Sequence, residues 1–165
     1  MPREEQVRNE RYRIGERVKA LIYLVERTVK GLSIFVSRTH PRFVAKLFEM
    51  EVPEILNGTV NIKFIAREPG SRSKIAVYSD TEGIDPVGSC VGQKGMRVNT
   101  VINELGGEKL DIVEWSENPE VFIKNAIAPA KIIDVDVDAE KRGAKILADE
   151  DQLSLAIGKN GQNVR

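Results

Sequence analysis

Two short segments bracketed by glycines have the residue types and spacing best suited to contact with a phosphate backbone. They are Gly92-Gln93-Lys94-Gly95 and Gly158-Lys159-Asn160-Gly161. Glycines without Cβ atoms let the backbone approach a sugar-phosphate chain closely, and the amides at the start of a following helix attract phosphate. A lysine in each segment adds positive charge, and Arg97 follows the first. Each segment is therefore a candidate GxxG loop, which can clamp about four nucleotides of single-stranded RNA.

A single GxxG segment supports RNA binding only weakly, because glycine caps give the same pattern in an ordinary helix-turn-helix. Here each segment follows an apolar residue, comes after a pair of predicted strands, and precedes a valine three residues beyond its second glycine. Ordinary helix caps seldom repeat with apolar residues at matching offsets. The sequence therefore predicts nine RNA-binding residues: Gly92, Gln93, Lys94, Gly95, Arg97, Gly158, Lys159, Asn160 and Gly161.

Other ligand chemistries find little support. The nucleotide-binding patterns G-x-x-x-x-G-K-[ST] and G-x-G-x-x-G do not occur. Asp134, Asp136 and Asp138 resemble the start of a calcium loop, but Ala139 and Lys145 stand where that loop needs glycine and glutamate. These aspartates alternate with apolar residues, so the solvated face of a strand explains them better. We expect no metal site and no cofactor.

No set of residues predicts catalysis, so we expect the chain not to be an enzyme. The sole histidine, His40, precedes Pro41 at the predicted start of a helix, where it suits helix capping better than proton transfer. The sole cysteine, Cys90, lies among small apolar residues, as a buried structural thiol does. Trp115, at the end of a predicted strand, suits packing more than base stacking.

The composition is that of a water-soluble chain able to bury a core. Of its 165 residues, 41% are apolar and 30% are charged, and the net charge is zero. Neutrality argues against nucleic acid, but residues 1–40 hold nine basic against five acidic residues, a surplus of four. No apolar run approaches the roughly eighteen residues of a membrane span, and no signal sequence is evident. We predict a cytoplasmic protein without membrane contact.

The pattern of apolar residues predicts a mixed α/β order of elements in the first two thirds of the chain. Strands are expected at residues 17–25 and 32–36, with Gly31 in the link between them. A helix with apolar residues at positions 43–50 follows and is ended or kinked by Pro53. Val60, Ile62 and Phe64 alternate with polar residues, which predicts a half-buried strand. The remaining expected elements are a strand over 74–79, a helix ending at residue 91, a helix over 96–105 and a strand over 109–115.

The same order begins again after Asn118-Pro119. A helix is expected over residues 120–127, strands over 131–137 and 144–148, and a helix over 152–157 that leads into the second glycine-bracketed segment. The sequence therefore contains an internal repeat, whose second copy we expect to be incomplete.

Nearly the whole chain resembles the middle part of the NusA family of bacterial transcription factors. The runs that carry the resemblance are EVPEI at 51–55, AREPGSR at 66–72, DPVGSCVG at 85–92, ELGGEK at 104–109 and AIGKNGQNVR at 156–165. In that family a polymerase-binding domain precedes an OB-type barrel of the ribosomal S-one kind, which is followed by two bacterial-type (type II) KH domains.

The resemblance implies an α/β (α+β) fold with three parts. Residues 1–39 would be the last strands of the barrel, residues 40–116 the first KH domain, and residues 117–165 a second KH domain that is truncated. It also implies that the chain contacts nascent single-stranded RNA and, in the full-length protein, RNA polymerase. The family's role in polymerase pausing, intrinsic termination and antitermination is the function that the resemblance predicts.

Two alternatives remain. An RNA-degrading exonuclease also combines a KH domain with an S-one barrel, but there the KH domain comes first, and the order here favours NusA. The other is a module that docks on RNA polymerase or ribosomal partners through its sheets and has little RNA binding of its own. Mapping RNA crosslinks to individual residues would separate this module from an RNA-binding region.

Overall fold

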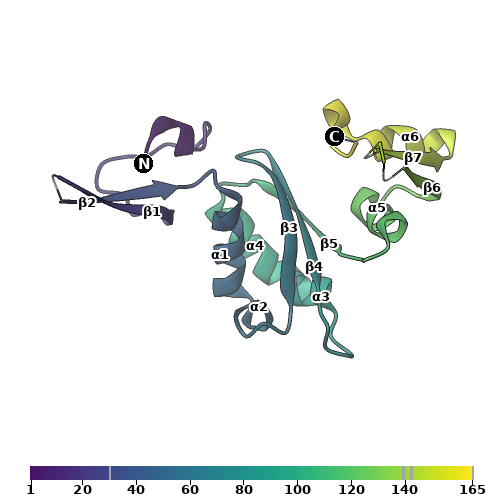
Figure 1. Cartoon of the computed structure of the whole chain (residues 1–165), viewed down its shortest axis with the longest axis horizontal. Helices are drawn as coiled ribbons and strands as arrows, with labels where there is room; N and C mark the ends of the chain where they lie inside the picture. Colours follow the sequence, from purple (N-terminus) through teal and green to yellow (C-terminus); the bar gives the residue numbers. More distant parts are fainter. Residues whose placement is uncertain (30, 139, 142, 165) are drawn as a thin grey trace. The chain divides into compact units, whose positions relative to one another are not determined.

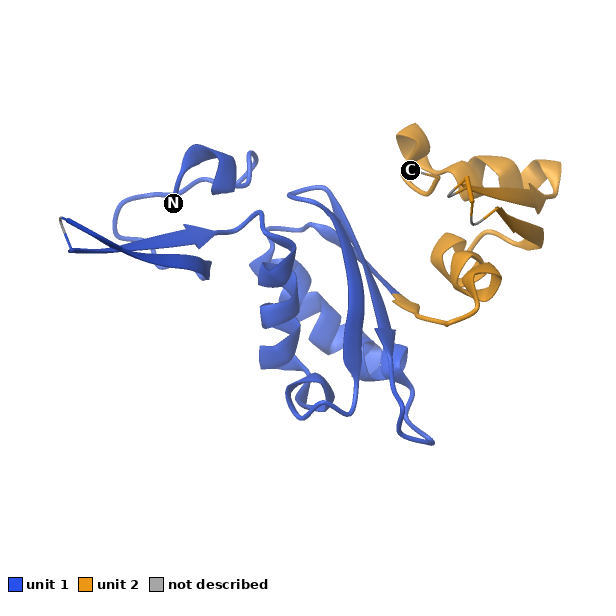
Figure 2. Ribbon diagram, viewed as in Figure 1, with its two compact units in different colours: residues 1–112 blue, residues 113–165 orange. Residues whose placement is uncertain are grey.

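The computed structural model describes residues 1–29, 31–138, 140–141 and 143–164. The chain divides into two compact units, Met1–Ile112 and Val113–Arg165 (Figure 2). Each unit contains one of the two glycine-bracketed segments. Within the described residues, no helix has the length and apolar character needed to cross a membrane.

The elements of the first two thirds of the chain appear in the predicted order (Figure 1). They are β1 (Leu21–Thr28), β2 (Gly31–Ser37), α1 (Pro41–Glu51), α2 (Pro53–Leu56), β3 (Asn61–Glu68), β4 (Arg72–Tyr78), α3 (Pro86–Val91), α4 (Met96–Glu104) and β5 (Lys109–Glu114). Short 3₁₀ turns lie at Arg3–Glu5 and Gln93–Gly95. As predicted, Pro53 interrupts the first helix, because proline starts a helix readily but cannot continue one.

The N-terminal hairpin differs from the prediction at both of its strands. β1 begins at Leu21 and not at residue 17, because its antiparallel pairing with β2 begins with Leu21 opposite Ser37. Gly31 is the first residue of β2, opposite Thr28, and not part of the link. Pairing with the partner strand therefore sets the ends of these strands. The composition of a single segment does not reveal this pairing.

Three strands in the order β3-β4-β5 form the sheet of the first unit, and β3 pairs antiparallel with β4. The predicted alternation in β3 fails at Phe64, which is 57% exposed, although Val60 is fully buried. The register shifts between Ile62 and Phe64, as a β-bulge does, and one extra residue moves the side chains that follow to the opposite face. Ile65 then packs against the core in place of Phe64.

Helices α1, α3 and α4 pack with this sheet around one apolar core (Figure 1). His40 caps α1 as predicted, since its Nδ1 accepts a hydrogen bond from the Arg42 amide at 3.1 Å. The fully or nearly fully buried residues of this core are Leu21, Phe43, Val44, Leu47, Phe48, Val52, Val60, Ile75, Val77, Cys90, Val101 and Leu105.

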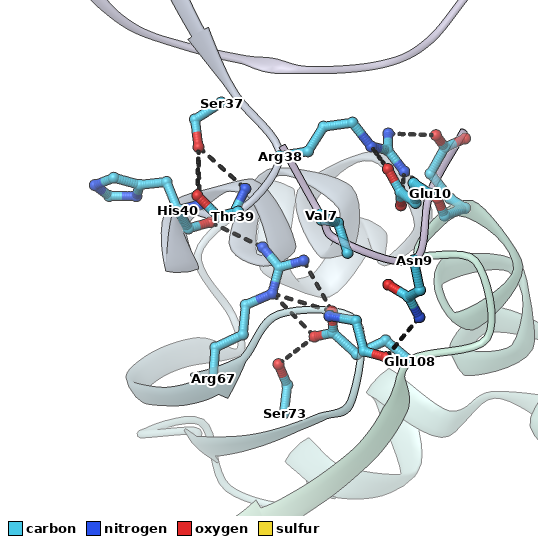
Figure 3. A network of polar contacts seen from close by, with 12 residues as sticks. Val7, Asn9, Glu10, Ser37, Arg38, Thr39, His40, Arg67, Ser73 and Glu108 are labelled. Carbon is cyan, nitrogen blue, oxygen red and sulfur yellow. Dashed lines mark hydrogen bonds and ion pairs between the residues drawn. The ribbon is translucent and has the colours of Figure 1, made fainter. Parts of the chain in front are cut away.

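A buried ion pair lies at the end of the sheet where β3 turns into β4 (Figure 3). Arg67 Nη2 lies 2.9 Å from Glu108 Oε2, and the two side chains are 1% and 0% exposed. The same carboxylate accepts hydrogen bonds from Ser73 Oγ at 2.6 Å and from the Gly70 amide at 2.8 Å. Arg67 also donates to the His40 carbonyl at 3.1 Å. Both buried charged groups thus have hydrogen-bond partners besides each other, as a buried ion pair requires.

A second polar cluster joins the N-terminal segment to the helices of the same unit. Arg38, 4% exposed, donates from Nη2 to Glu10 Oε1 at 2.6 Å and to the Glu104 carbonyl at 2.7 Å. Asn9 Nδ2 donates to the Gly70 carbonyl at 3.0 Å (Figure 3). The hydrogen bonds from Arg38 to Glu104 and from Asn9 to Gly70 therefore cross the predicted boundary between residues 1–39 and 40–116, and that boundary stays a prediction.

The second unit repeats the first part of the pattern with α5 (Pro119–Ile127), the antiparallel strands β6 (Ile132–Asp138) and β7 (Gly143–Ala148), and α6 (Glu150–Ile157) (Figure 1). The Asn118 side chain caps α5. Among the described residues, the core of this unit consists of Ile127, Ala130 and Ala156, and three isoleucines pack against them.

The alternation predicted for the second repeat holds only over residues 134–136, beyond a register shift between Ile132 and Asp134 in β6, because Val137 and Asp138 are both half-buried. Val135 is 2% exposed and its aspartate neighbours are exposed, but Ile133 is 55% exposed because it lies at the shift. Ala139, which stands where a calcium loop needs glycine, lies outside the described residues.

Candidate nucleic-acid interface

The first glycine-bracketed segment is a tight loop between α3 and α4. Gly92 has φ 73° and ψ 174°, a region that only glycine adopts readily, and Gly95 is left-handed with φ 76°. The Gly95 amide donates to the Gly92 carbonyl at 3.1 Å and closes the turn. Lys94, between them, is also left-handed with φ 51°. A non-glycine residue there costs about 1–2 kcal/mol, so the rest of the loop must hold Lys94 in this conformation.

The second segment has the same backbone. Gly158 has φ 73° and ψ 169°, Asn160 has φ 55°, and Gly161 has φ 71°. The Gly161 amide donates to the Gly158 carbonyl at 3.1 Å, as in the first loop. The left-handed residue is an asparagine here, which tolerates that conformation better than lysine does. Two loops with different sequences therefore share one conformation.

The middle residues of both loops face solvent. Gln93, Lys94, Lys159 and Asn160 are all exposed. The cation occupies the third position of the first loop but the second position of the second loop. Each loop thus presents a positive charge on an exposed turn at which bare backbone can approach a ligand closely.

Arg97 lies behind the first loop. Its Nη1 donates to the Ser89 carbonyl at 2.7 Å and lies 2.9 Å from Glu54 Oε2. A Cβ atom placed on Gly92 would stand 2.8 Å from Arg97 Cγ, so the stem of the arginine covers the first glycine. The sequence predicted an RNA contact for Arg97 and did not predict its ion pair with Glu54.

Asn163 takes the corresponding place in the second loop. Its Nδ2 donates to the Leu155 carbonyl at 3.1 Å, and a Cβ atom on Gly158 would stand 2.9 Å from the same nitrogen. Asn163 was not among the predicted site residues. The signal was present in the sequence, since Arg97 and Asn163 are each the fifth residue after the first glycine of their loop.

The residues set aside as ligands lie apart from these loops or carry structural roles. Cys90 is fully buried, and burial raises the pKa of its thiol to about 12, which keeps it protonated and unreactive near neutral pH. Across the described part of the chain, no three His, Cys, Asp or Glu residues are grouped so as to hold a metal ion. His40 is occupied as a helix cap.

The fold and the loops together define a class. In the first unit, the order helix, two strands, helix, GxxG loop, helix and strand, with the loop exposed, is that of a KH domain. The second unit has the same order as far as its own GxxG loop. The chain is therefore a tandem KH-domain protein.

Comparisons with known proteins identify the kind of KH domain. Residues 38–115 match the model of the NusA-like first KH domain, and residues 119–165 match that of the NusA-like second KH domain. The chain belongs to the NusA family.

Proteins named transcription termination/antitermination protein NusA align with the whole chain. Those of Halalkalibacterium halodurans and Bacillus subtilis are each 53% identical to it, and that of Thermus thermophilus is 48% identical. The chain spans 43%, 44% and 43% of these proteins, less than half of each. The crystal structure of APE1850 is also similar, with a TM-score of 0.54 and 25% identity over 73% of this chain and 81% of the other.

Proposed function

We propose that this chain is a single-stranded RNA-binding region that contacts RNA through Gly92–Gly95 and residues 158–161. The observation that carries the proposal is the shared backbone of the two loops. Both place a glycine-only conformation and a left-handed turn at matching positions, and both expose a lysine. A left-handed lysine is strained, and such strain is kept where it serves a function.

The relatives supply the biological setting of the proposal. They carry the name transcription termination/antitermination protein, so we infer that the whole protein, in the cytoplasm, modulates pausing, intrinsic termination and antitermination by RNA polymerase. Nascent RNA is then the ligand of this region, and RNA polymerase is a partner of the full-length protein. The loops present backbone and charge for binding and no catalytic group, so we propose no enzyme activity and no cofactor.

One observation favours the alternative of a protein-docking module. Strands β1 and β2 expose large apolar side chains, including Ile22 at 58%, Leu32 at 70% and Ile34 at 59%. An exposed apolar patch of this kind commonly marks a protein contact. It lies on the N-terminal hairpin and not at the GxxG loops, so a docking role for the hairpin is compatible with RNA binding by the loops.

The test is a charge reversal at both loops, Lys94→Asp with Lys159→Asp, in the full chain. We expect affinity for single-stranded RNA to be lost while the circular dichroism spectrum is unchanged, because both side chains are exposed and aspartate repels phosphate. Each single variant should weaken binding and flatten the dependence of log affinity on log salt by about 0.7 per lost contact.

The matched control reverses two exposed lysines outside the loops, Lys109→Asp with Lys131→Asp. It changes the net charge by the same amount and should lower affinity only slightly. Unchanged RNA affinity in the loop variant with a native spectrum would rule out the GxxG loops as the binding site. Equal losses in both variants would show a diffuse effect of charge and not a loop contact.

A further inference from the structure

The same side-chain hydrogen bond supports both GxxG loops, although a different type of residue donates it in each loop. In each loop the fifth residue after the first glycine donates to the backbone carbonyl three residues before that glycine. Arg97 Nη1 donates to the Ser89 carbonyl at 2.7 Å, and Asn163 Nδ2 donates to the Leu155 carbonyl at 3.1 Å. The hydrogen bond thus joins the last turn of the helix before the loop to the first turn after it.

The carbonyls that accept these hydrogen bonds lie in the last turn of each helix. The last four carbonyls of a helix have no partner within it and need a donor from elsewhere. Ser89 lies in the final turn of α3, and Leu155 lies in the final turn of α6. A donor at these positions satisfies an end carbonyl and at the same time sets the direction in which the chain leaves the loop.

The side chain that donates this hydrogen bond also packs against the first glycine of the loop. A Cβ on Gly92 would stand 2.8 Å from Arg97 Cγ, and one on Gly158 would stand 2.9 Å from Asn163 Nδ2. The supporting side chain therefore fills the space beside the glycine, and the glycine is needed both for its backbone angles and for this close approach.

We propose that Arg97 and Asn163 are positioning residues that hold the GxxG loops in the RNA-binding conformation, and that Arg97 acts through the loop backbone and not as a phosphate contact. The guanidinium of Arg97 already has two partners, the Ser89 carbonyl and Glu54, and both are on the protein. Asn163 performs the same task without any charge, so charge is not what the position requires. This inference rests on the proposed RNA-binding function of the loops.

The test replaces Arg97 in the full chain with the residue that the other loop uses. Arg97→Ala removes the hydrogen bond, and we expect RNA affinity to fall about tenfold, since one lost hydrogen bond from a charged donor has about that effect. Arg97→Asn removes the charge but restores a short amide donor, and we expect affinity within about twofold of the parent chain with an unchanged salt dependence. Asn163→Ala should show the corresponding loss in the second loop.

Hydrogen exchange at the amides of residues 92–96 provides a readout that does not depend on RNA. Arg97→Ala should speed exchange there, and Arg97→Asn should not. If Arg97→Asn binds as weakly as Arg97→Ala and the salt dependence flattens by about one contact, Arg97 touches phosphate and the inference is wrong.

Parent-like affinity and parent-like exchange in Arg97→Ala would also overturn the inference. Should the parent chain itself fail to bind RNA, the proposed function falls, and the exchange rates of the two variants still decide whether Arg97 positions the loop.

Discussion

The two GxxG loops share one backbone conformation but stand on cores of very different size. In the first unit, the core below the loop contains twelve buried apolar residues, among them Phe48 and Ile75 at 1% exposure. In the described part of the second unit, three buried residues form the core, and two of them are alanines. Conformation of the loop is therefore independent of the size of the core that carries it.

The reason is that the loop's conformation is specified locally. Glycines at its first and fourth positions, a left-handed third residue and a supporting donor all lie within nine residues of sequence, from Ser89 to Arg97. A large core is needed to keep the helices that flank the loop folded, because helices in proteins are stabilised mainly by tertiary packing. The two units should differ in stability much more than they differ in loop geometry.

The largest expected effect of this difference appears when the units are separated. Expressed alone, residues 1–116 should unfold cooperatively, because they include the whole large core and both polar clusters. Residues 117–165 should lack a cooperative transition, since a core of three buried residues, two of them alanines, does not offset the entropy of ordering that many residues. Thermal unfolding followed by circular dichroism checks both. A sharp unfolding transition in residues 117–165 would contradict the expected difference in stability between the two units.

The next largest effect is expected at the buried ion pair of the first unit. Glu108→Ala leaves Arg67 charged and almost fully buried without its carboxylate, which should lower the free energy of unfolding by about 3–5 kcal/mol. The matched control is Glu49→Ala, which breaks the partly exposed pair with Lys46 and should change stability by less than about 0.5 kcal/mol. Urea titrations measure both values. Similar losses in the two variants would show that burial does not decide the strength of the pair.

Acid should produce a smaller effect, confined mainly to the first unit. Burial opposes the charge of Glu10, but hydrogen bonds from Arg38 and Tyr12 and the charge of Arg38 outweigh it and lower the pKa of the carboxyl below its ordinary value of 4.5. A carboxyl whose folded pKa is depressed adds stability above its unfolded pKa and loses it as pH falls through the folded one. Stability of the first unit should therefore decline below about pH 4.5.

Glu10→Gln provides the control for this acid effect, because glutamine does not titrate and should remove part of the decline. In the second unit, hydrogen bonds from the Lys141 amide and side chain lower the pKa of Asp138, which is a surface group. Its replacement by asparagine should alter the acid response much less. Urea titrations at pH 7 and at pH 4 measure both variants, and an acid response of Glu10→Gln equal to that of the parent chain would contradict the assignment.

Patterns within a few residues were enough to predict most of the elements and the two loops. Helix starts at His40 and Asn118, the interruption at Pro53 and the GxxG turns all follow from capping and backbone angles, which a residue and its immediate neighbours determine. The repeat of these local signals also showed that the chain contains two related units. Sequence alone thus determined the order of elements and the kind of loop.

Only the tertiary structure decided which distant residues meet. Arg67 and Glu108 are 41 positions apart, and neither belongs to a motif that predicts a partner. The bulge that turns Phe64 outward depends on its pairing with β4, and the role of Arg97 depends on where Glu54 and the Ser89 carbonyl lie. Strand register and buried charge pairs result from packing of the whole unit, so a local pattern carries no record of them.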